Sequence, residues 1–376
     1  MKITIIVTAY PYRGGLSAYN ERLAREFIAQ GDDVTIETFT LQYPDFLFPG
    51  KTQYSTEPAP ESLHIVRSVS SVNPFNWISV GKRIAKQTPD LLVVNYWLPF
   101  MSPCFGTIAR YVRRNGKTKV MSILHNIIPH EKRFFDKPLS GYFVRAVDGF
   151  VAMSQSVLTD LEQFDTKKPR AFYPHPLYDN FGQKKTRAQA LAALGLDASF
   201  SYILFFGFIR DYKGLDILLE AMADERLRQK NVKLIIAGEF YNNPDRYFEL
   251  EKKYGIGDKL IWRNDYIPDA QVSSYFSAAD IIAQPYKSAT QSGVTQIAYH
   301  FEKPMLVTNV GGLSEIVPNG KVGYVVEPDA KEVADALCSF YENDRIAFFE
   351  ENIREEKKKY AWSGMTDTIK SMVDAR

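Results

Sequence analysis

The chain has 376 residues with a net charge of +2, and 45% of its residues are hydrophobic and 24% charged. The chain is longer than an ordinary domain with one hydrophobic core, so its length predicts two domains, and its composition excludes a disordered protein. The two cysteines, Cys104 and Cys338, lie in opposite halves. They exclude a disulfide framework and favour a cytoplasmic setting, and no apolar run has the length of a signal peptide or a membrane span.

The charge is unevenly distributed along the chain. Residues 1–180 hold 21 basic and 16 acidic residues, a net +5, and the remainder holds 25 basic and 28 acidic residues, a net −3. This modest asymmetry gives no support to nucleic-acid binding. It fits either peripheral contact of the N-terminal half with the anionic inner membrane face or scattered solvated charge.

Strand-like apolar runs alternate with helical patterns along the whole chain, which predicts α/β architecture with parallel sheets. In the first half the expected strands are Ile3–Thr8, Val34–Phe39, Leu91–Asn95, Lys119–His125 and Gly149–Met153. In the second half they are Ser201–Phe206, Val232–Ala237, Lys259–Trp262, Ile281–Gln284, Met305–Thr308 and Tyr324–Val326. A helix is expected over Ser17–Gln30, followed by a stop at Gly31.

The break between these sets falls in Tyr173–Gly182, where two prolines and a glycine forbid a continuous helix. We therefore expect Rossmann-like domains over residues 1–178 and 179–358, and a last segment, 359–376, that forms a helix. Open α/β sheets place their ligands at the carboxyl ends of their strands. The chemistry is thus expected in loops that follow strands, facing a central cleft between the domains.

Two features of the first half fit that place. Gly14 and Gly15 follow the first strand, where they allow a ligand close to backbone N–H groups near a helix end. A tight turn with positive φ explains the pair equally well, and no dinucleotide-binding fingerprint is present. His125 ends another strand and is placed to face the cleft, although a lone histidine is more often structural.

Aromatic residues gather in two further segments of the first half, Tyr96–Met101 and Pro74–Ile78. We interpret both as loops that choose the acceptor by packing on a sugar ring or a lipid carrier. Buried packing is the more frequent fate of such side chains.

The second half carries two cations in the loop after its first strand. Arg210 and Lys213 stand where they would neutralise a diphosphate and stabilise its charge as it leaves. The alternative is a surface loop in which either cation pairs with Asp211.

A turn rich in small polar residues opens a later helix in the second half. Thr290 to Val294, of sequence Thr-Gln-Ser-Gly-Val, offers unpaired N–H groups to an anion. Simple N-capping by Thr290 or Ser292 is the alternative. Glu315 begins the next helix, where it complements at least the helix dipole.

Other chemistries lack their motifs. No Cys, His, Asp and Glu cluster has metal-ligand spacing, and the chain has no Asp-x-Asp pair, Gly-x-Ser-x-Gly motif or Walker-type loop. We therefore expect neither a bound metal nor another cofactor.

Taken together and in this order, the segments resemble the retaining glycosyltransferases of family four, which have the GT-B fold. The resemblance covers nearly the whole chain. Its strongest parts are Gly14-Gly15, Lys213-Gly214, the run Lys303–Val317 and Trp362. It implies two Rossmann-like domains and a C-terminal helix that crosses back to the N-terminal domain.

The resemblance also implies roles for individual residues. His125 would lie near the transferred sugar, and main chain at Tyr266 and Ile267 would meet the nucleobase. The donor diphosphate would be held by Gly14, Gly15, Arg210, Lys213, Ser292, Gly293 and Val294. Thr290, Gln291 and Glu315 complete the expected donor site.

Two departures from the family pattern concern this same site. Phe208 stands where an arginine is usual, and Arg210 comes two places later. The family's Glu-x7-Glu motif falls on Ala289 and Ile297, so both carboxylates are replaced. Thr290 and Gln291 would then offer neutral hydrogen bonds to the donor instead.

The predicted function is sugar transfer from a nucleotide-sugar to an acceptor hydroxyl, with retention, in the synthesis of bacterial surface polysaccharide or glycolipid. The expected partners are the donor and a glycan or lipid-linked glycan acceptor. Two other functions stay open: a nucleotide-sugar epimerase, for which the sequence offers no convincing acid and base pair, and a catalytically silent nucleotide-sugar-binding subunit, which the missing glutamates favour.

Overall fold

The computed structural model describes residues 1–44, 52–55, 58–129, 134–289 and 292–374. The chain divides into two compact units. The first, here the N-unit, comprises Met1–Pro176 and Ala361–Arg376, and the second, the C-unit, comprises Leu177–Tyr360. Both crossings between the units lie within three residues of the expected boundaries at 178 and 358.

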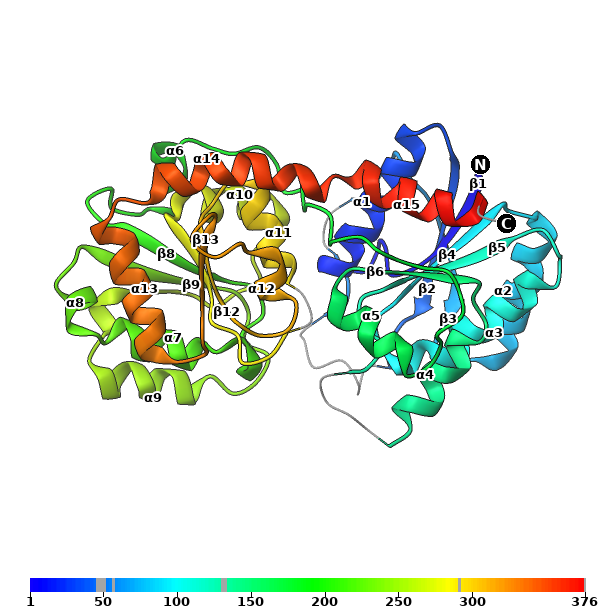
Figure 1. The fold of residues 1–376 in the computed structure, drawn as a ribbon, viewed down its shortest axis with the longest axis horizontal. Helices are drawn as coiled ribbons and strands as arrows, with labels where there is room; N and C mark the ends of the chain where they lie inside the picture. The colour runs from blue at the N-terminus through cyan, green and yellow to red at the C-terminus, as the bar shows by residue number, and fades with distance from the viewer. Residues whose placement is uncertain (45–51, 56–57, 130–133, 290–291, 375–376) are drawn as a thin grey trace. The chain divides into compact units, whose positions relative to one another are not determined.

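The N-unit is built on a parallel sheet (Figure 1). Seven strands of the described part of the chain form it, in the order β3-β2-β1-β4-β5-β6-β7. They are β1 Lys2–Ile6, β2 Asp33–Leu41, β3 His64–Ser70, β4 Leu91–Tyr96, β5 Lys119–Leu124, β6 Gly149–Ala152 and β7 Arg170–Phe172. All six residues of β4 are buried, as expected for a central strand of a parallel sheet covered on both faces.

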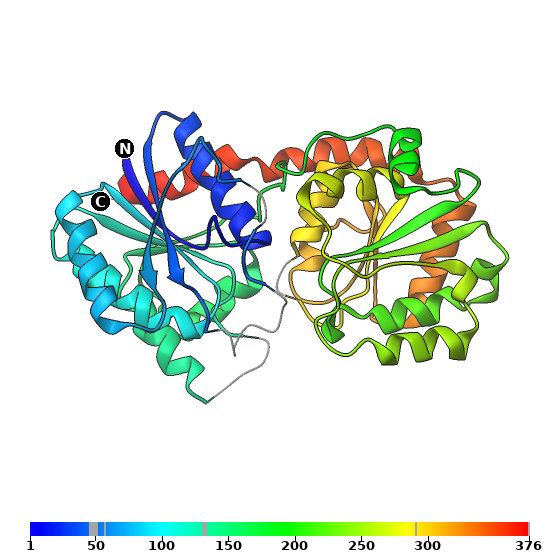
Figure 2. The same ribbon diagram turned by 180° about the vertical axis from the view of Figure 1, so that it is seen from behind.

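Helices cover both faces of this sheet (Figures 1 and 2). They are α1 Gly15–Ala29, α2 Pro74–Gln87, α3 Ser102–Arg113, α4 Asp136–Val144, α5 Gln155–Glu162 and α15 Trp362–Asp374, with a short 3₁₀ turn at Pro99–Met101. α3 packs between α2 and α4, whereas α15 packs against α1. The last helix therefore returns to the N-unit, as expected.

The C-unit repeats the architecture with a parallel sheet in the order β10-β9-β8-β11-β12-β13. Its strands are β8 Ser201–Phe206, β9 Val232–Ala237, β10 Leu260–Arg263, β11 Ile281–Gln284, β12 Met305–Thr308 and β13 Gly323–Val326. Its helices are α6 Arg187–Leu194, α7 Leu215–Met222, α8 Glu225–Arg228, α9 Asp245–Tyr254, α10 Asp269–Ala278, α11 Gly293–His300, α12 Leu313–Ile316, α13 Ala330–Glu342 and α14 Ile346–Glu356. Short 3₁₀ turns lie at Asp211–Lys213, Gly257–Lys259 and Lys357–Tyr360.

Each sheet has one point where its strand order reverses. In the N-unit this switch point lies between β1 and β4, and in the C-unit it lies between β8 and β11. Loops that leave two such strands run to opposite sides of the sheet and leave a crevice at the carboxyl edge. The glycine pair after β1, and the loops after β8 and β11, are therefore placed at switch points.

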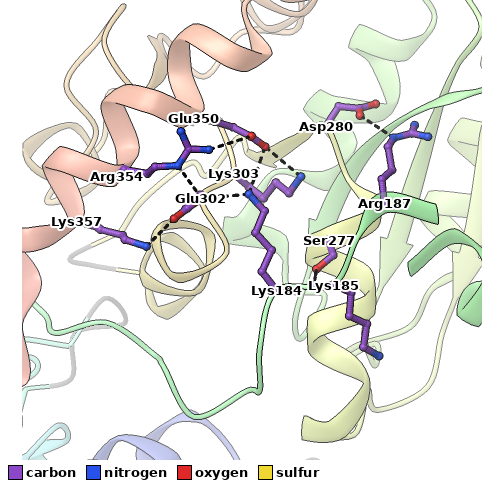
Figure 3. Close-up of polar contacts among 10 residues, drawn as sticks. All are labelled: Lys184, Lys185, Arg187, Ser277, Asp280, Glu302, Lys303, Glu350, Arg354 and Lys357. Atoms are coloured by element: carbon purple, nitrogen blue, oxygen red, sulfur yellow. Dashed lines mark hydrogen bonds and ion pairs between the residues drawn. The ribbon is translucent and has the colours of Figure 1, made fainter. Parts of the chain in front are cut away.

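An ion network fixes the chain where it enters and leaves the C-unit (Figure 3). Glu302, at the end of α11, accepts hydrogen bonds from Lys184 at 3.2 Å, Arg354 at 3.1 Å and Lys357 at 2.8 Å. Lys184 also pairs with Glu350 of α14. Burial raises the pKa of Glu302, but the hydrogen bonds from Lys357 and Lys184 outweigh it and lower the pKa to about 2. The carboxylate is thus a stable anchor for both segments.

Two hydrogen bonds and a ring contact hold the chain at the two crossings. The N–H of Leu177, the first residue of the C-unit, donates to the carbonyl of Tyr360, the last, at 3.1 Å. Within the N-unit, the Tyr173 hydroxyl donates to the carbonyl of Ala361 at 2.5 Å. Trp362 packs on Tyr19 of α1, with ring centroids 5.0 Å apart.

Two strands of the N-unit were not expected from the sequence, and one segment has a different structure from the expected one. β3 and β7 form the two edges of the N-unit sheet, where strands are half-exposed and lack a continuous apolar run. Pro74–Ile78 is the first turn of α2 and no loop: Asn73 caps the helix by accepting from the N–H groups of Phe75 and Asn76, and proline suits the first helical position. In the described part of the chain, no helix is both long and apolar enough to span a bilayer.

Candidate active site

The two loops at the C-unit switch point are packed against each other. Gly214 ends the loop after β8 with φ of 67°, and a Cβ on it would lie 1.9 Å from the carbonyl oxygen of Pro285, after β11. The N–H of Lys287 donates to the carbonyl of Tyr212 at 2.7 Å. Glycine is therefore required at position 214, and the approach it allows brings the Lys213 loop onto the loop that leads to α11.

Lys213 is buried in this loop, with only 8% of its surface exposed. Its ammonium lies 5.7 Å from the centre of the Tyr286 ring. It also lies 3.0 Å from the point where a Cβ on Gly207 would stand, and a methyl of Val294 lies 3.9 Å from that point. Burial, reinforced by the charge of Arg210, lowers the pKa of Lys213 to about 7.

Arg210 is half-buried beside Lys213, and its guanidinium lies over the Tyr241 ring at 3.6 Å from the centroid. Within the described ranges, no carboxylate forms an ion pair with Arg210 or Lys213. Asp211 pairs instead with Arg246 at 2.5 Å and with Lys287 at 3.3 Å. The alternative of a surface loop closed by an Asp211 pair with either site cation is therefore wrong.

The turn before α11 faces the same region. α11 begins at Gly293, and Ser292, in extended conformation, makes no side-chain cap to it. The Ser292 hydroxyl lies 3.4 Å from the Tyr286 hydroxyl. A Cβ on Gly293 would lie 2.7 Å from the Tyr178 ring, so glycine is also needed here. N-capping by Ser292 is thus contradicted, whereas Thr290 and Gln291 lie outside the described residues.

The remaining donor-site predictions in the C-unit lie after β10, at the edge of the sheet, and after β12. Ile267 is buried after β10, and the Tyr266 hydroxyl lies 3.5 Å from a carboxylate oxygen of Asp269. Glu315 lies on α12 and is exposed. All three positions follow strands of the same parallel sheet.

The positions of the missing glutamates are filled by apolar side chains. Ala289 and Ile297 are 7% and 6% exposed, so both are part of the core. A buried apolar residue supplies neither a charge nor a hydrogen bond to a sugar. A donor bound at the turn before α11 would therefore meet no carboxylate from positions 289 and 297, and would depend on main-chain N–H groups and cations.

In the N-unit, Gly14 caps α1 with φ of 104°. A Cβ there would meet no atom within 4 Å, so conformation rather than space requires glycine. Gly15 is the first residue of α1. The tight-turn interpretation of the pair therefore holds for Gly14.

His125 directly follows β5 and lies in an aromatic cluster. Its ring centre is 5.1 Å from that of Tyr19, which is 5.0 Å from His175. Burial, with a smaller contribution from His175, lowers the pKa of His125 to about 3, and burial lowers that of His175 to about 4. Both imidazoles are neutral near pH 7, so His125 can exchange hydrogen bonds but carries no positive charge.

The predicted aromatic segments of the N-unit are only partly exposed. Tyr96 is buried and stacks on Phe143 at 4.4 Å. The Trp97 indole donates to the Tyr43 hydroxyl at 2.8 Å. Phe75, by contrast, is 83% exposed. Most of these rings are packing residues, and Phe75 is available to a partner.

Several residues of the site escaped the sequence analysis. Tyr286 and Lys287 directly follow an expected strand, so their place could have suggested a role. Tyr241, Arg246 and Tyr178 are distant in the sequence and have no motif. Among the residues that the structure describes, no group of three or more His, Cys, Asp and Glu side chains could hold a metal ion.

Comparison with known proteins gives the same assignment for both units. Residues 13–174 match the family model "Glycosyltransferase Family 4", and residues 201–343 match "Glycosyl transferases group 1". A D-inositol 3-phosphate glycosyltransferase of Corynebacterium glutamicum is 23% identical over 96% of this chain and 91% of its own length. One of Segniliparus rotundus is 30% identical, but the match spans 51% of this chain and 44% of that protein.

Solved structures share the fold. Sucrose-phosphate synthase from Thermosynechococcus elongatus has a TM-score of 0.78 at 18% identity, with all of both chains covered. Anabaena HepE, whose structure contains UDP and glucose, has a TM-score of 0.75 at 14% identity, again over both whole chains. With two parallel-sheet units and both family models matched in order, the chain belongs to the family 4 (group 1) glycosyltransferases of the GT-B fold.

Proposed function

We propose that this glycosyltransferase uses a nucleotide-sugar donor and that Arg210, Lys213 and the N–H groups at Ser292–Val294 bind its diphosphate. The observation that carries the proposal is Lys213. It is a buried ammonium with no carboxylate partner among the described residues, and such a charge is costly unless an anion meets it. The N-terminus of α11 supplies the partial positive charge of a helix end at the same switch point.

The proposed chemistry needs little from acid and base groups. The bond between the anomeric carbon and the β-phosphate oxygen breaks, and the acceptor oxygen bonds to that carbon. The acceptor proton passes to the departing phosphate, and the stereochemistry is retained. Negative charge develops on the diphosphate during this step, so the fixed charges of Arg210 and Lys213 stabilise the transition state more than the ground state.

Other residues have supporting roles in this proposal. His125, as a neutral imidazole, would hydrogen-bond the transferred sugar, and Gly14 and Gly15 would approach the donor phosphates. Tyr266 and Ile267 would meet the nucleobase, and Thr290, Gln291 and Glu315 would complete the donor site. Because two protein cations supply the positive charge, we propose a reaction without a bound metal ion, which undiminished turnover in EDTA would support.

We assign acceptor binding to the N-unit. A cavity of about 130 Å³ follows His125 in the chain, and its lining residues are Ile127, Ile128, Pro129, Asp136, Lys137, Gln163 and Phe164. Phe134, two residues before Asp136 in the sequence, is 94% exposed. With the basic excess of residues 1–180, these groups suit a lipid-linked glycan at the inner membrane face, as in the synthesis of bacterial surface polysaccharide or glycolipid. Sedimentation with anionic and neutral vesicles tests this part, and equal binding to both would contradict it.

The main test is a donor screen. Thermal shift with UDP-, GDP-, ADP- and dTDP-sugars is followed by assays of nucleoside diphosphate release with glycan acceptors, lipid-linked acceptors and the D-inositol 3-phosphate named for two relatives. Release that depends on one acceptor, with the product anomer assigned by NMR, supports the proposal. Release or isomerisation without any acceptor would indicate an epimerase, and donor binding without turnover would indicate a silent subunit.

A further inference from the structure

Four charged side chains form a cluster at the Lys213 loop: Asp211, Asp216, Arg246 and Lys287, here the outer charge cluster. The Asp211 side chain is 58% exposed and that of Arg246 is 44% exposed. Arg246 lies 2.5 Å from Asp211 and 3.5 Å from Asp216. Lys287 lies 3.3 Å from Asp211 and 2.7 Å from Asp216. Each cation thus contacts both carboxylates.

The members of this cluster come from four separate places in the C-unit. Asp211 begins the 3₁₀ turn directly after Arg210, and Asp216 lies in the first turn of α7. Arg246 lies in the first turn of α9, and Lys287 follows β11. A single exposed ion pair contributes little, but a closed network fixes the direction in which each side chain points.

That direction matters because Asp211 is the acidic residue nearest in sequence to both site cations. It directly follows Arg210 and precedes Lys213 by two residues. Burial raises the pKa of Asp211, but hydrogen bonds from Arg246 and Lys287 outweigh it and lower the pKa. The residue is therefore a carboxylate, and a carboxylate turned toward Lys213 would compete with a diphosphate for the same charge.

We infer that Arg246 and Lys287 are positioning residues of the donor site. They pair with the carboxylates of Asp211 and Asp216 and so leave Arg210 and Lys213 for the diphosphate. This inference rests on the proposed function, because it takes the bound anion to be the donor diphosphate. Neither positioning residue needs to touch the donor.

The test is a suppressor experiment with two probes, UDP and inorganic pyrophosphate, measured by calorimetry at low salt. The double variant R246M/K287M is expected to bind both probes about five- to tenfold more weakly, because the released Asp211 carboxylate partly neutralises the site. Adding D211N should restore affinity to within about twofold of wild type. D211N alone is expected to bind at least as tightly as wild type.

Two controls separate this effect from a change in folding. R226M, on α8, removes exposed ion pairs of Arg226 with Asp224 and with Asp335 of α13, and is expected to leave the affinity unchanged. K287R keeps the charge and should bind as wild type. Thermal unfolding of every variant identifies loss of fold, and the single variants R246M and K287M replace the double variant if it is unstable.

The experiment separates failure of the positioning role of Arg246 and Lys287 from failure of the proposed function. If wild type binds neither probe, or K213M binds as tightly as wild type, the diphosphate assignment itself fails. If wild type binds and K213M does not, yet D211N fails to restore R246M/K287M, the inference alone is overturned, because the cations would then act on loop structure rather than on Asp211. Unchanged affinity in folded R246M/K287M would also overturn it.

Discussion

Lys213 in the C-unit and His125 in the N-unit are both basic side chains buried beside a parallel sheet, yet their surroundings differ. Lys213 lies among glycine backbone, the Tyr286 ring and a second cation, and burial lowers its pKa from the usual 10.5 to about 7. His125 lies among Tyr19 and a second imidazole, and its pKa falls to about 3. Because lysine starts from the higher pKa, a large share of Lys213 is still charged near neutral pH, whereas His125 is neutral.

This difference indicates a division of labour between the units. A charged group without a carboxylate partner is suited to an anion, whereas a neutral imidazole within an aromatic cluster is suited to directional hydrogen bonds with a neutral sugar. In the proposed reaction, the C-unit would then supply the electrostatic stabilisation, and the N-unit would supply shape and hydrogen bonding.

The largest expected effect is loss of the site cations. K213M should lower turnover about 100-fold or more, and R210M by a similar or somewhat smaller factor because Arg210 is less buried. K233M is the matched control, since Lys233 also lies over an aromatic ring, Phe200, at 4.3 Å but on β9. The three variants are compared by their steady-state rates of nucleoside diphosphate release. Wild-type rates in both K213M and R210M would contradict the assignment of the diphosphate to the C-unit cations.

Substitution of Gly214 in the C-unit should lower the free energy of unfolding more than substitution of Gly14 in the N-unit. G214A places a Cβ 1.9 Å from a carbonyl oxygen at positive φ, so it should prevent folding of the loop or lower the free energy of unfolding by more than about 3 kcal/mol. G14A meets no atom within 4 Å and should cost about 1–2 kcal/mol from backbone strain. Urea unfolding compares them, and equal losses would contradict the close approach of the two C-unit loops.

The pH dependence of diphosphate binding should follow Lys213 and not His125. Because the pKa of Lys213 is about 7, the cation is lost as the pH rises, and affinity should fall by up to about tenfold per pH unit above 7. With UDP as the probe, the terminal phosphate is a monoester with a last pKa of about 6, so it is already mostly ionised above pH 7. K213R should flatten the profile, and a wild-type profile that is flat from pH 7 to 9 would contradict a titrating lysine.

The smallest effect is expected for E302Q. The pKa of Glu302 is lowered to about 2 in the folded state, so its contribution to stability is fully present above the unfolded pKa of about 4.5 and is lost as the pH falls toward 2. E302Q should lower the free energy of unfolding by about 1 kcal/mol at pH 7, with a smaller difference from wild type at pH 3. If the difference in free energy of unfolding between wild type and E302Q grew as the pH fell, the lowered pKa of Glu302 would be contradicted.

The central strands could be predicted from the sequence because parallel strands buried on both faces are continuous apolar runs, as in Leu91–Tyr96. The same rule fails at the sheet edges. β3, of sequence His-Ile-Val-Arg-Ser-Val-Ser, and the three-residue β7 pack on only one neighbouring strand, so polar residues are tolerated there.

The part of the candidate site that could be predicted is the part whose residues all lie in one loop of the sequence. Arg210, Lys213 and Gly214 lie together in the sequence, directly after a strand. The partners of Asp211 were not predictable, because Arg246 begins a helix whose charges resemble an ordinary solvated face and only the fold brings it to the loop. An ion pair depends on side-chain direction, which periodicity does not report.

The hydrogen bond between Leu177 and Tyr360 closes the C-unit into a continuous insertion within the N-unit, with its first and last residues in contact. On the ribosome, all residues of this insertion emerge before α15 does. We therefore expect the C-unit to fold first, while the N-unit waits for its final helix. A fragment of residues 177–360 should unfold cooperatively on its own, whereas residues 1–176 without α15 should expose the hydrophobic surface of α1, and an ANS-binding comparison of the two fragments would decide the order.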